Sequence, residues 1–267
     1  MFSPRAVASA IVALRGTTCA MLDGLADDQL DLPALPDWSV ADVFRHLAEG
    51  DRGSVQVRSL RHFLPGKDLF AYERVNDDAL SRLRAAPRAQ LRRELQTWGR
   101  RLAMIVRVTP TPLGRIRIPS AFGTLPLAWF GVLRLYDEWV HQYDVATAVG
   151  APDPELPGST ADMLAQFHLA AVKADALNNL ATRPGVVEVA VGDATRVRPW
   201  RFDLTSRDAG PGLAQPASVE IACDVGAWCL LAADRLTWQD LEEQGRLKIV
   251  GDDRAAAEAL LDVVRVV

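Results

Sequence analysis

The chain has 267 residues and a formal net charge of −4; 49% of its residues are hydrophobic and 24% are charged. This is the composition of a folded globular protein of one large or two ordinary domains. Its acidic balance argues against nucleic acid as a main partner, and no uninterrupted apolar run approaches the ~20 residues that cross a bilayer.

The N-terminal half is predicted to be helical, because apolar residues recur there at spacings of three and four. A first helix is expected from about residue 4 to 25, and its rhythm indicates a mature helix rather than a signal peptide. Ser39 is expected to cap a second helix over 40–63. A third follows from about 88 to 106, and a fourth from about Pro126 to Gly150.

The C-terminal half has a different pattern. A linker at 151–159 and a fifth helix at 160–180 lead to alternating segments that are typical of strands. The expected elements are strands at 185–192, 200–206, 217–224 and 246–251, helices at 225–234 and 252–264, and a flexible connection at 208–218. The sequence therefore predicts a helical region followed by a small α+β domain.

The cysteines and two of the histidines carry no motif. Cys19, Cys223 and Cys229 are few and widely spaced, with no CxxC pair, which favours buried thiols in a reducing cytoplasm. His62 and His168 are isolated, so we interpret them as surface or packing residues.

The fourth predicted helix carries polar residues in an apolar setting. "YDEWVHQYDVA" (136–146) contains Asp137, Glu138, His141 and Asp144. Residues four apart lie on the same helix face, so Asp137 and His141 share one face, and Glu138 is expected to turn away from it. A buried carboxylate is unfavourable unless something positive meets it, and an acid and a histidine at this spacing can reach one metal ion.

The second predicted helix offers a third ligand. In "WSVADVFRHLAEGD", His46 lies at the edge of the apolar row formed by Val40, Val43, Phe44 and Leu47. If the two helices are neighbours, His46 converges with Asp137 and His141. Two imidazoles and a carboxylate with open positions form a competent site for zinc, iron or nickel. The alternative is structural: His46 as a hydrogen-bonded core residue, and the Asp–His pair as a brace within the bundle.

Two motifs give the chain a family resemblance. "LPDWSVADVFRHLAEGD" resembles the second-helix motif of the mycothiol-dependent maleylpyruvate isomerase family, which is a Trp, a capping Ser or Thr, and a His followed by Leu. "YDEWVHQYDVATAVG" resembles its fourth-helix motif, in which an acid lies four residues before a His and an aromatic–Asp pair follows; here that pair is Tyr143 and Asp144.

The resemblance implies a two-domain α+β fold. Residues 1–150 would form a DinB-like up-down-down-up four-helix bundle with the metal site, and 151–184 a linker and connecting helix. Residues 185–267, which include "VEIACDVGAWCLLAADR", resemble a small sterol-carrier-like α+β domain. In the family, the His of the second helix and the acid–His pair of the fourth bind one divalent metal, usually zinc, so the resemblance implies His46, Asp137 and His141 as ligands.

The implied function is that of a metal-dependent, thiol-using enzyme. The metal would activate the thiolate of mycothiol for addition to an electrophile, in an isomerase or an S-transferase, with no catalytic residue beyond the ligands. The residues that contact mycothiol are not indicated by the sequence. Expected partners are the thiol and a small electrophilic substrate, with no nucleic acid and no membrane, in a cytoplasmic monomer or homodimer.

The chain departs from the family pattern at the acid. Family members usually have Glu where this chain has Asp137, and often Arg where it has Tyr136. Glu138 is an alternative ligand at the neighbouring position. Two other functions therefore stay open: a metal-dependent hydrolase of the DinB-like superfamily, and a non-catalytic protein that binds a small molecule or lipid.

Overall fold

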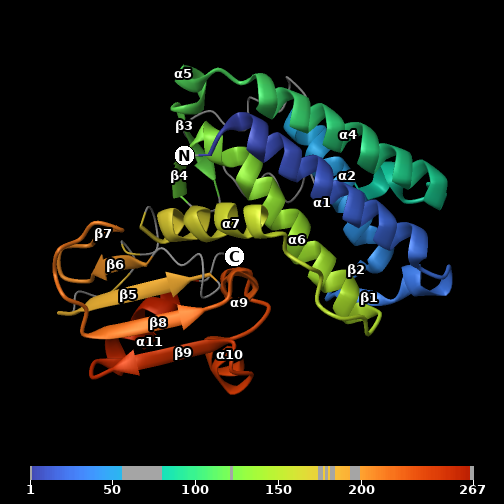
Figure 1. Ribbon diagram of the computed structural model, residues 1–267. Coiled ribbons are helices and arrows are strands. Elements are labelled where there is room, and N and C mark those ends of the chain that lie inside the picture. Colours follow the sequence, from blue (N-terminus) through green and yellow to red (C-terminus); the bar gives the residue numbers. More distant parts are fainter. Residues whose placement is uncertain are drawn as a thin grey trace. The chain divides into compact units, whose positions relative to one another are not determined.

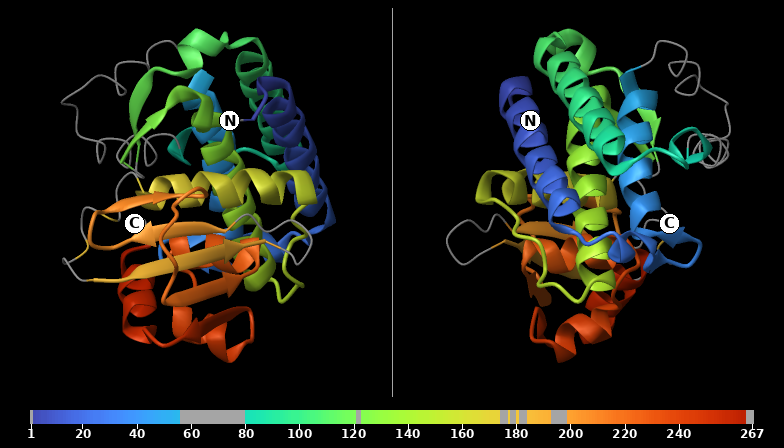
Figure 2. Two further views of the ribbon diagram at one scale, coloured as in Figure 1. Left: turned by 60° about the vertical axis from the view of Figure 1, so that its left-hand side comes forward. Right: turned by 90° about the vertical axis from the view of Figure 1, so that its right-hand side faces the viewer.

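The computed structural model describes residues 2–55, 80–120, 123–173, 177, 180, 184–192 and 199–264. The chain divides into two compact units (Figures 1 and 2). The first comprises residues 1–119 and 126–156, and the second residues 120–125 and 157–267. The first is helical and the second contains a five-stranded sheet, so the fold is mixed α+β, as predicted.

Long helices build the N-terminal unit, which we call the bundle. Those that the structure describes are α1 (Pro4–Gly24), α2 (Val40–Val55), α4 (Arg88–Val108) and α6 (Phe130–Ala148). Helix α1 packs against α4 and α6, and α2 packs against the same two helices. Their apolar rows meet in a core that includes Leu22, Phe44, Leu47, Leu95 and Val145. The predicted extension of α2 to residue 63 lies outside the described residues.

Side-chain caps fix where two of these helices begin. The N–H of Ala6 donates to Ser3 Oγ (3.2 Å) at the start of α1. At the start of α2, the N–H of Asp42 donates to Ser39 Oγ (3.3 Å), and the N–H of Ser39 donates back to Asp42 Oδ2 (3.1 Å). This reciprocal pair confirms the predicted cap and sets the register of the helix that carries His46.

Helix α1 also has the length and composition of a membrane-spanning segment. About half of the apolar stretch of α1 is buried within the protein, as is usual for core helices of globular proteins. The helix also lies near the N-terminus, where signal sequences are found. Its buried positions include Val7, Ile11, Leu14 and Leu22.

Short elements lie between the helices. Strands β1 (Pro33–Leu35) and β2 (Trp38–Ser39) pair before α2, and β3 (Arg117–Ser120) pairs with β4 (Gly123–Pro126) before α6. A short helix, α5 (Thr111–Gly114), and two 3-10 turns, η1 (Asp28–Asp31) and η3 (Leu127–Trp129), also lie in the described connections. The predicted start of the fourth helix at Pro126 is therefore wrong, because Pro126 ends a strand and a 3-10 turn intervenes before Phe130.

The second unit contains a sheet of strand order β7-β6-β5-β8-β9. The strands are β5 (Val186–Val191), β6 (Trp200–Asp203), β7 (Asp208–Gly210), β8 (Val219–Cys223) and β9 (Leu247–Gly251). The β5–β8 pair is parallel and the other pairs are antiparallel. Strand β7 lies in the segment predicted to be a flexible connection; it was missed because only three residues pair.

The helices described in this unit are α7 (Gly158–Ala171), α9 (Val225–Ala232), α10 (Trp238–Glu243) and α11 (Arg254–Val263). Helix α11 packs on β5, β8 and β9, and α7 packs on α9 (Figure 1). Helix α10 was not predicted, although Thr237 and Asp240 form a capping box at its start. All three cysteines are free and buried, as predicted for buried thiols.

Candidate metal centre

Three side chains from two helices converge inside the bundle. His46 comes from α2, and Asp137 and His141 come from α6. One ligand atom from each lies within 4.8 Å of the other two. Asp137 Oδ1 is 3.5 Å from His46 Nε2 and 3.9 Å from His141 Nε2. The structure therefore brings together the three residues that the sequence singled out.

Helical spacing explains how this cluster forms. Val43, Phe44 and Leu47 are buried and pin one face of α2 to the core, and His46, at the edge of that face, is carried inward with them. On α6, the i, i+4 relation places Asp137 one turn from His141 on the face toward α2.

His46 is a buried imidazole whose ring nitrogens both lack a hydrogen bond to the described residues. Burial lowers its pKa, and the nearby Asp137 carboxylate only partly opposes that effect. The ring is therefore neutral at physiological pH, which is the form that binds metals. A buried polar group without a partner is costly, and a cation at this point would supply one.

Asp137 is partly exposed, at 25% of its side-chain surface, and has a positive neighbour. Its Oδ2 forms an ion pair with Arg134 Nη1 at 3.0 Å, one turn back on α6. Burial by itself would raise the carboxyl pKa, but the Arg134 guanidinium outweighs it and holds the pKa of Asp137 well below its usual range. Asp137 is thus an anion whose Oδ1 faces the histidines.

His141 is oriented by a second acid. Its Nδ1 lies 2.9 Å from Asp144 Oδ2, and Asp144 is only 3% exposed. A carboxylate at Nδ1 favours the tautomer with the proton there, which leaves Nε2 free as an acceptor toward the cluster. The Trp38 ring lies 4.8 Å from the His46 ring and 5.9 Å from the His141 ring, so it packs beside both imidazoles.

A buried charge network lies behind Asp137. Arg134 Nε is 3.2 Å from Asp51 Oδ1, and Asp51 Oδ2 accepts from Arg15 Nη2 at 2.6 Å. Arg15 Nε is 3.1 Å from Glu138 Oε1. The network therefore runs from α6 through α2 to α1 and supports the arginine that contacts Asp137.

Glu138 turns away from the face that carries Asp137 and His141, and its carboxylate lies against α1. It is 2% exposed and accepts a hydrogen bond from Thr18. Burial raises its pKa, which the Arg15 guanidinium partly opposes. Because its carboxylate faces α1, Glu138 belongs to the buried network, and Asp137 is the acid beside the histidines.

The atoms that the cluster offers are of the kinds that bind a divalent metal. Two neutral imidazole nitrogens and one carboxylate oxygen are common zinc ligands, and tetrahedral zinc ligands lie ~3.4 Å apart. The two measured histidine–aspartate separations, 3.5 and 3.9 Å, are close to that spacing. The outer partners Asp144 and Arg134 provide the supporting contacts that metal ligands usually have.

Of the other two histidines, the structure describes one. His62 is outside the described residues. His168 lies on α7 in the second unit and is only 1% exposed, which agrees with a packing role and excludes a surface one.

Sequence reasoning missed the supporting residues more than the cluster itself. Arg134 could have been found, because it lies three residues before Asp137 on the same helix. Arg15 and Asp51 could not, because their contacts join positions 36 or more residues apart and no local pattern marks them.

Comparison with known proteins places the chain in a family. The solved mycothiol-dependent maleylpyruvate isomerase is 13% identical, and the alignment covers 88% of this chain and 93% of that one with a TM-score of 0.55. A histidine-to-alanine mutant of it is 14% identical, with the same coverage and TM-score. Sterol carrier protein 2 like 2 from Aedes aegypti is 22% identical over 37% of this chain and 94% of its own, with a TM-score of 0.33.

At these identities, the first two likenesses show a shared fold. No curated protein sequence matches the chain. The sequence profile of the mycothiol maleylpyruvate isomerase N-terminal domain matches residues 12–146, which is just over half of the chain and includes all three residues of the cluster. The protein therefore belongs to the mycothiol maleylpyruvate isomerase N-terminal domain family.

Proposed function

We propose that the protein is a mycothiol-dependent isomerase or S-transferase in which His46, Asp137 and His141 hold a divalent metal, most simply zinc. The observation that carries this proposal is the convergence of the three ligand atoms within 4.8 Å in a member of this family. A purely structural role for His46 as a hydrogen-bonded core residue accounts for it less well, because its Nδ1 and Nε2 make no hydrogen bond to the described residues.

The cluster suits thiol activation because it has a single anionic ligand. A free thiol has a pKa of about 8.5 and is mostly protonated at neutral pH. When bound, a zinc ion with an open position lowers the pKa of such a thiol so that the thiolate forms. Asp137 contributes one negative charge and His46 is neutral, so the ligand set does not cancel a divalent charge.

The side chains around the cluster maintain its geometry while a substrate reacts. Asp144 holds the His141 ring, Arg134 holds the Oδ2 side of Asp137, and Trp38 packs beside both imidazoles. In an isomerase, the thiolate sulfur adds to one carbon of a conjugated double bond, and the π electrons move onto the conjugated carbonyl. After rotation about the resulting single bond, the double bond re-forms and the thiolate leaves. In a transferase, the adjacent carbon takes up a proton and the carbon–sulfur bond remains.

Zinc titration tests the ligand set. Metal-free protein titrated with zinc against a chromophoric chelator should bind one equivalent, and His46→Ala and His141→Ala should each weaken binding at least ~100-fold, since each removes a ligand. His168→Gln is the matched control, a buried histidine outside the cluster, and should bind as wild type does. Wild-type protein that binds no stoichiometric zinc would overturn the metal centre.

Cobalt spectroscopy tests the thiol. Addition of mycothiol to the cobalt-substituted protein should produce a sulfur-to-cobalt charge-transfer band. S-methyl mycothiol is the control, because it cannot form a thiolate. A spectrum that mycothiol leaves unchanged, in protein that does bind cobalt at His46, Asp137 and His141, would reject thiol activation and favour a hydrolase at the same site.

A further inference from the structure

A groove lies between α1 and α4, within the bundle. It encloses about 520 Å³, a volume in the range of small-molecule sites. Ala8 and Val12 line it from α1, and Ala103 and Met104 line it from α4. Val12 is 49% exposed, which leaves apolar surface open to a ligand.

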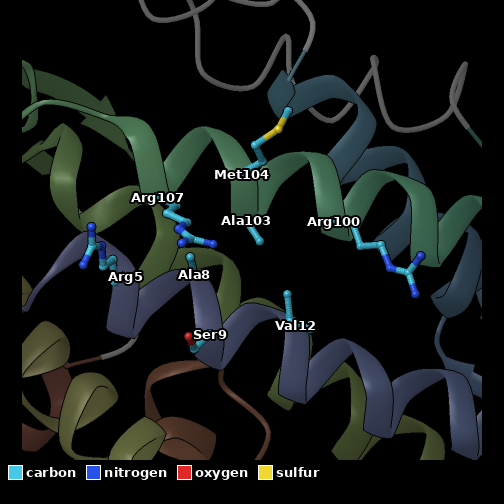
Figure 3. A pocket seen from close by; sticks show the side chains of 8 residues that line it. All are labelled: Arg5, Ala8, Ser9, Val12, Arg100, Ala103, Met104 and Arg107. Carbon is cyan, nitrogen blue, oxygen red and sulfur yellow. The ribbon is translucent and has the colours of Figure 1, made fainter.

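Three arginines surround this apolar surface. Arg5 and Arg107 lie at one end of the groove and Arg100 at the other, with Val12 and Ala103 pointing into the space between the helices (Figure 3). All three arginines are exposed, and none forms an ion pair with a carboxylate in the described part of the chain. Among the described residues, the positive charge of the groove therefore has no carboxylate partner.

The distribution of acids along the two helices explains this charge. Helix α1 contains a single acid, Asp23, and α4 contains a single acid, Glu94. Asp23 pairs with Arg92 at 2.7 Å, and Glu94 pairs with Arg82 at 3.0 Å, so both acids are used away from the groove. Neither acid of these two helices is therefore available to the arginines of the groove.

We infer that the groove between α1 and α4 binds a small amphiphilic organic anion. Its acidic group would be held by the Arg5–Arg107 end, where guanidinium forks match carboxylate or phosphate oxygens, and its apolar body would lie on Val12 and Ala103. A second copy of the chain suits the groove less well, because a two-fold contact through it would bring like charges together. The inference does not depend on the metal cluster.

Octanoate is a suitable probe, because it joins an apolar chain to an anionic group. Octanol, which has the apolar chain without the charge, and inorganic phosphate, which has the charge without the chain, are the controls. Isothermal titration of the full chain should show octanoate binding at least ~10-fold more tightly than either control. The double variant Arg5→Gln/Arg107→Gln should weaken octanoate binding at least ~10-fold, since it removes the charges that hold the carboxylate. Arg93→Gln, an exposed arginine of α4 that does not line the groove, is the matched control and should leave binding unchanged.

A second variant tests the apolar surface separately. Val12→Glu places a hydrated carboxylate on this half-exposed position, where the bundle can accommodate it, and should also weaken octanoate binding because the apolar body of the ligand loses its contact there. Octanoate binding that is unchanged in both variants would overturn the inference, as would octanol or phosphate binding equally well. Concentration-dependent dimerisation of wild type that Met104→Glu abolishes would instead identify the groove as a contact between copies.

Discussion

Each unit buries a histidine, but in different surroundings. In the bundle, His46 and His141 lie against Asp137 and Asp144, with Arg134 and Asp51 behind them. In the second unit, His168 sits in an interior where burial alone lowers its pKa to about 3. Among the described residues of that unit, the one buried carboxylate, Asp203, accepts backbone N–H groups of the turn at Thr205.

This contrast separates a candidate site from ordinary packing. Buried ion pairs are often no more stabilising than well-packed apolar residues of similar size, so a network of this extent is not explained by stability alone. The second unit shows that this chain can build a core from residues such as Phe202, Ile221 and Trp228 without such a network. We therefore expect the bundle's charges to affect metal binding, and the second unit's polar groups to affect stability only.

The largest loss of stability should come from the substitution of Asp51. It is 1% exposed and contacts both Arg15 and Arg134, so Asp51→Ala leaves two buried guanidiniums without their shared acid. We expect a loss of about 3–5 kcal/mol in the free energy of unfolding, measured by urea denaturation. Asp27→Ala, which removes a 98%-exposed partner of Arg88, should cost less than ~1 kcal/mol. Equal losses in the two variants would show that the buried guanidiniums of Arg15 and Arg134 do not depend on Asp51.

Asp144 should act on metal binding. Its carboxylate fixes the His141 ring without being a ligand itself, so Asp144→Asn should weaken zinc binding by about 10- to 100-fold. Competition with a chromophoric chelator measures this change. Asp203→Asn, a buried acid of the second unit, is the comparison and should leave zinc affinity as in wild type. An Asp144→Asn variant with unchanged affinity would place this acid outside the function of the cluster.

The sequence predicted the three residues of the cluster but not the residues that support them, because the supporting contacts join residues that are far apart in the chain. The pairing of Asp137 with His141 follows from helical periodicity, and one further assumption, that two helices are neighbours, brings in His46. The network needs Arg15 and Asp51, which meet only after α1 and α2 have packed, so periodicity carries no information about them. Similarly, long helices and alternating strands were predicted, whereas β7, with three residues, was not.

His168 should make stability depend on pH. Its folded-state pKa of about 3 lies below the unfolded value near 6.5, so the unfolded chain binds the proton first and stability is lost as the pH falls below about 6.5. Between pH 7.5 and 5.0, this linkage amounts to about 2 kcal/mol. Wild type should therefore lose about 2 kcal/mol more than His168→Gln over this range, by urea denaturation of chelator-treated protein. Parallel losses would show that His168 is accessible to protons when folded.

The smallest expected effect is the loss of stability when a helix cap is removed. Ser39 caps α2 with Asp42, and Thr237 caps α10 with Asp240. Ser39→Ala and Thr237→Ala should each cost about 1 kcal/mol of stability, because each leaves a first-turn N–H without its acceptor. Only Ser39→Ala should also weaken zinc binding, since α2 carries His46 and its first turn follows directly on Trp38, which packs beside both imidazoles. Thermal denaturation and chelator competition, run on both variants, separate the two effects. If Thr237→Ala weakened zinc binding as much as Ser39→Ala, the metal centre would depend on general stability rather than on the position of α2.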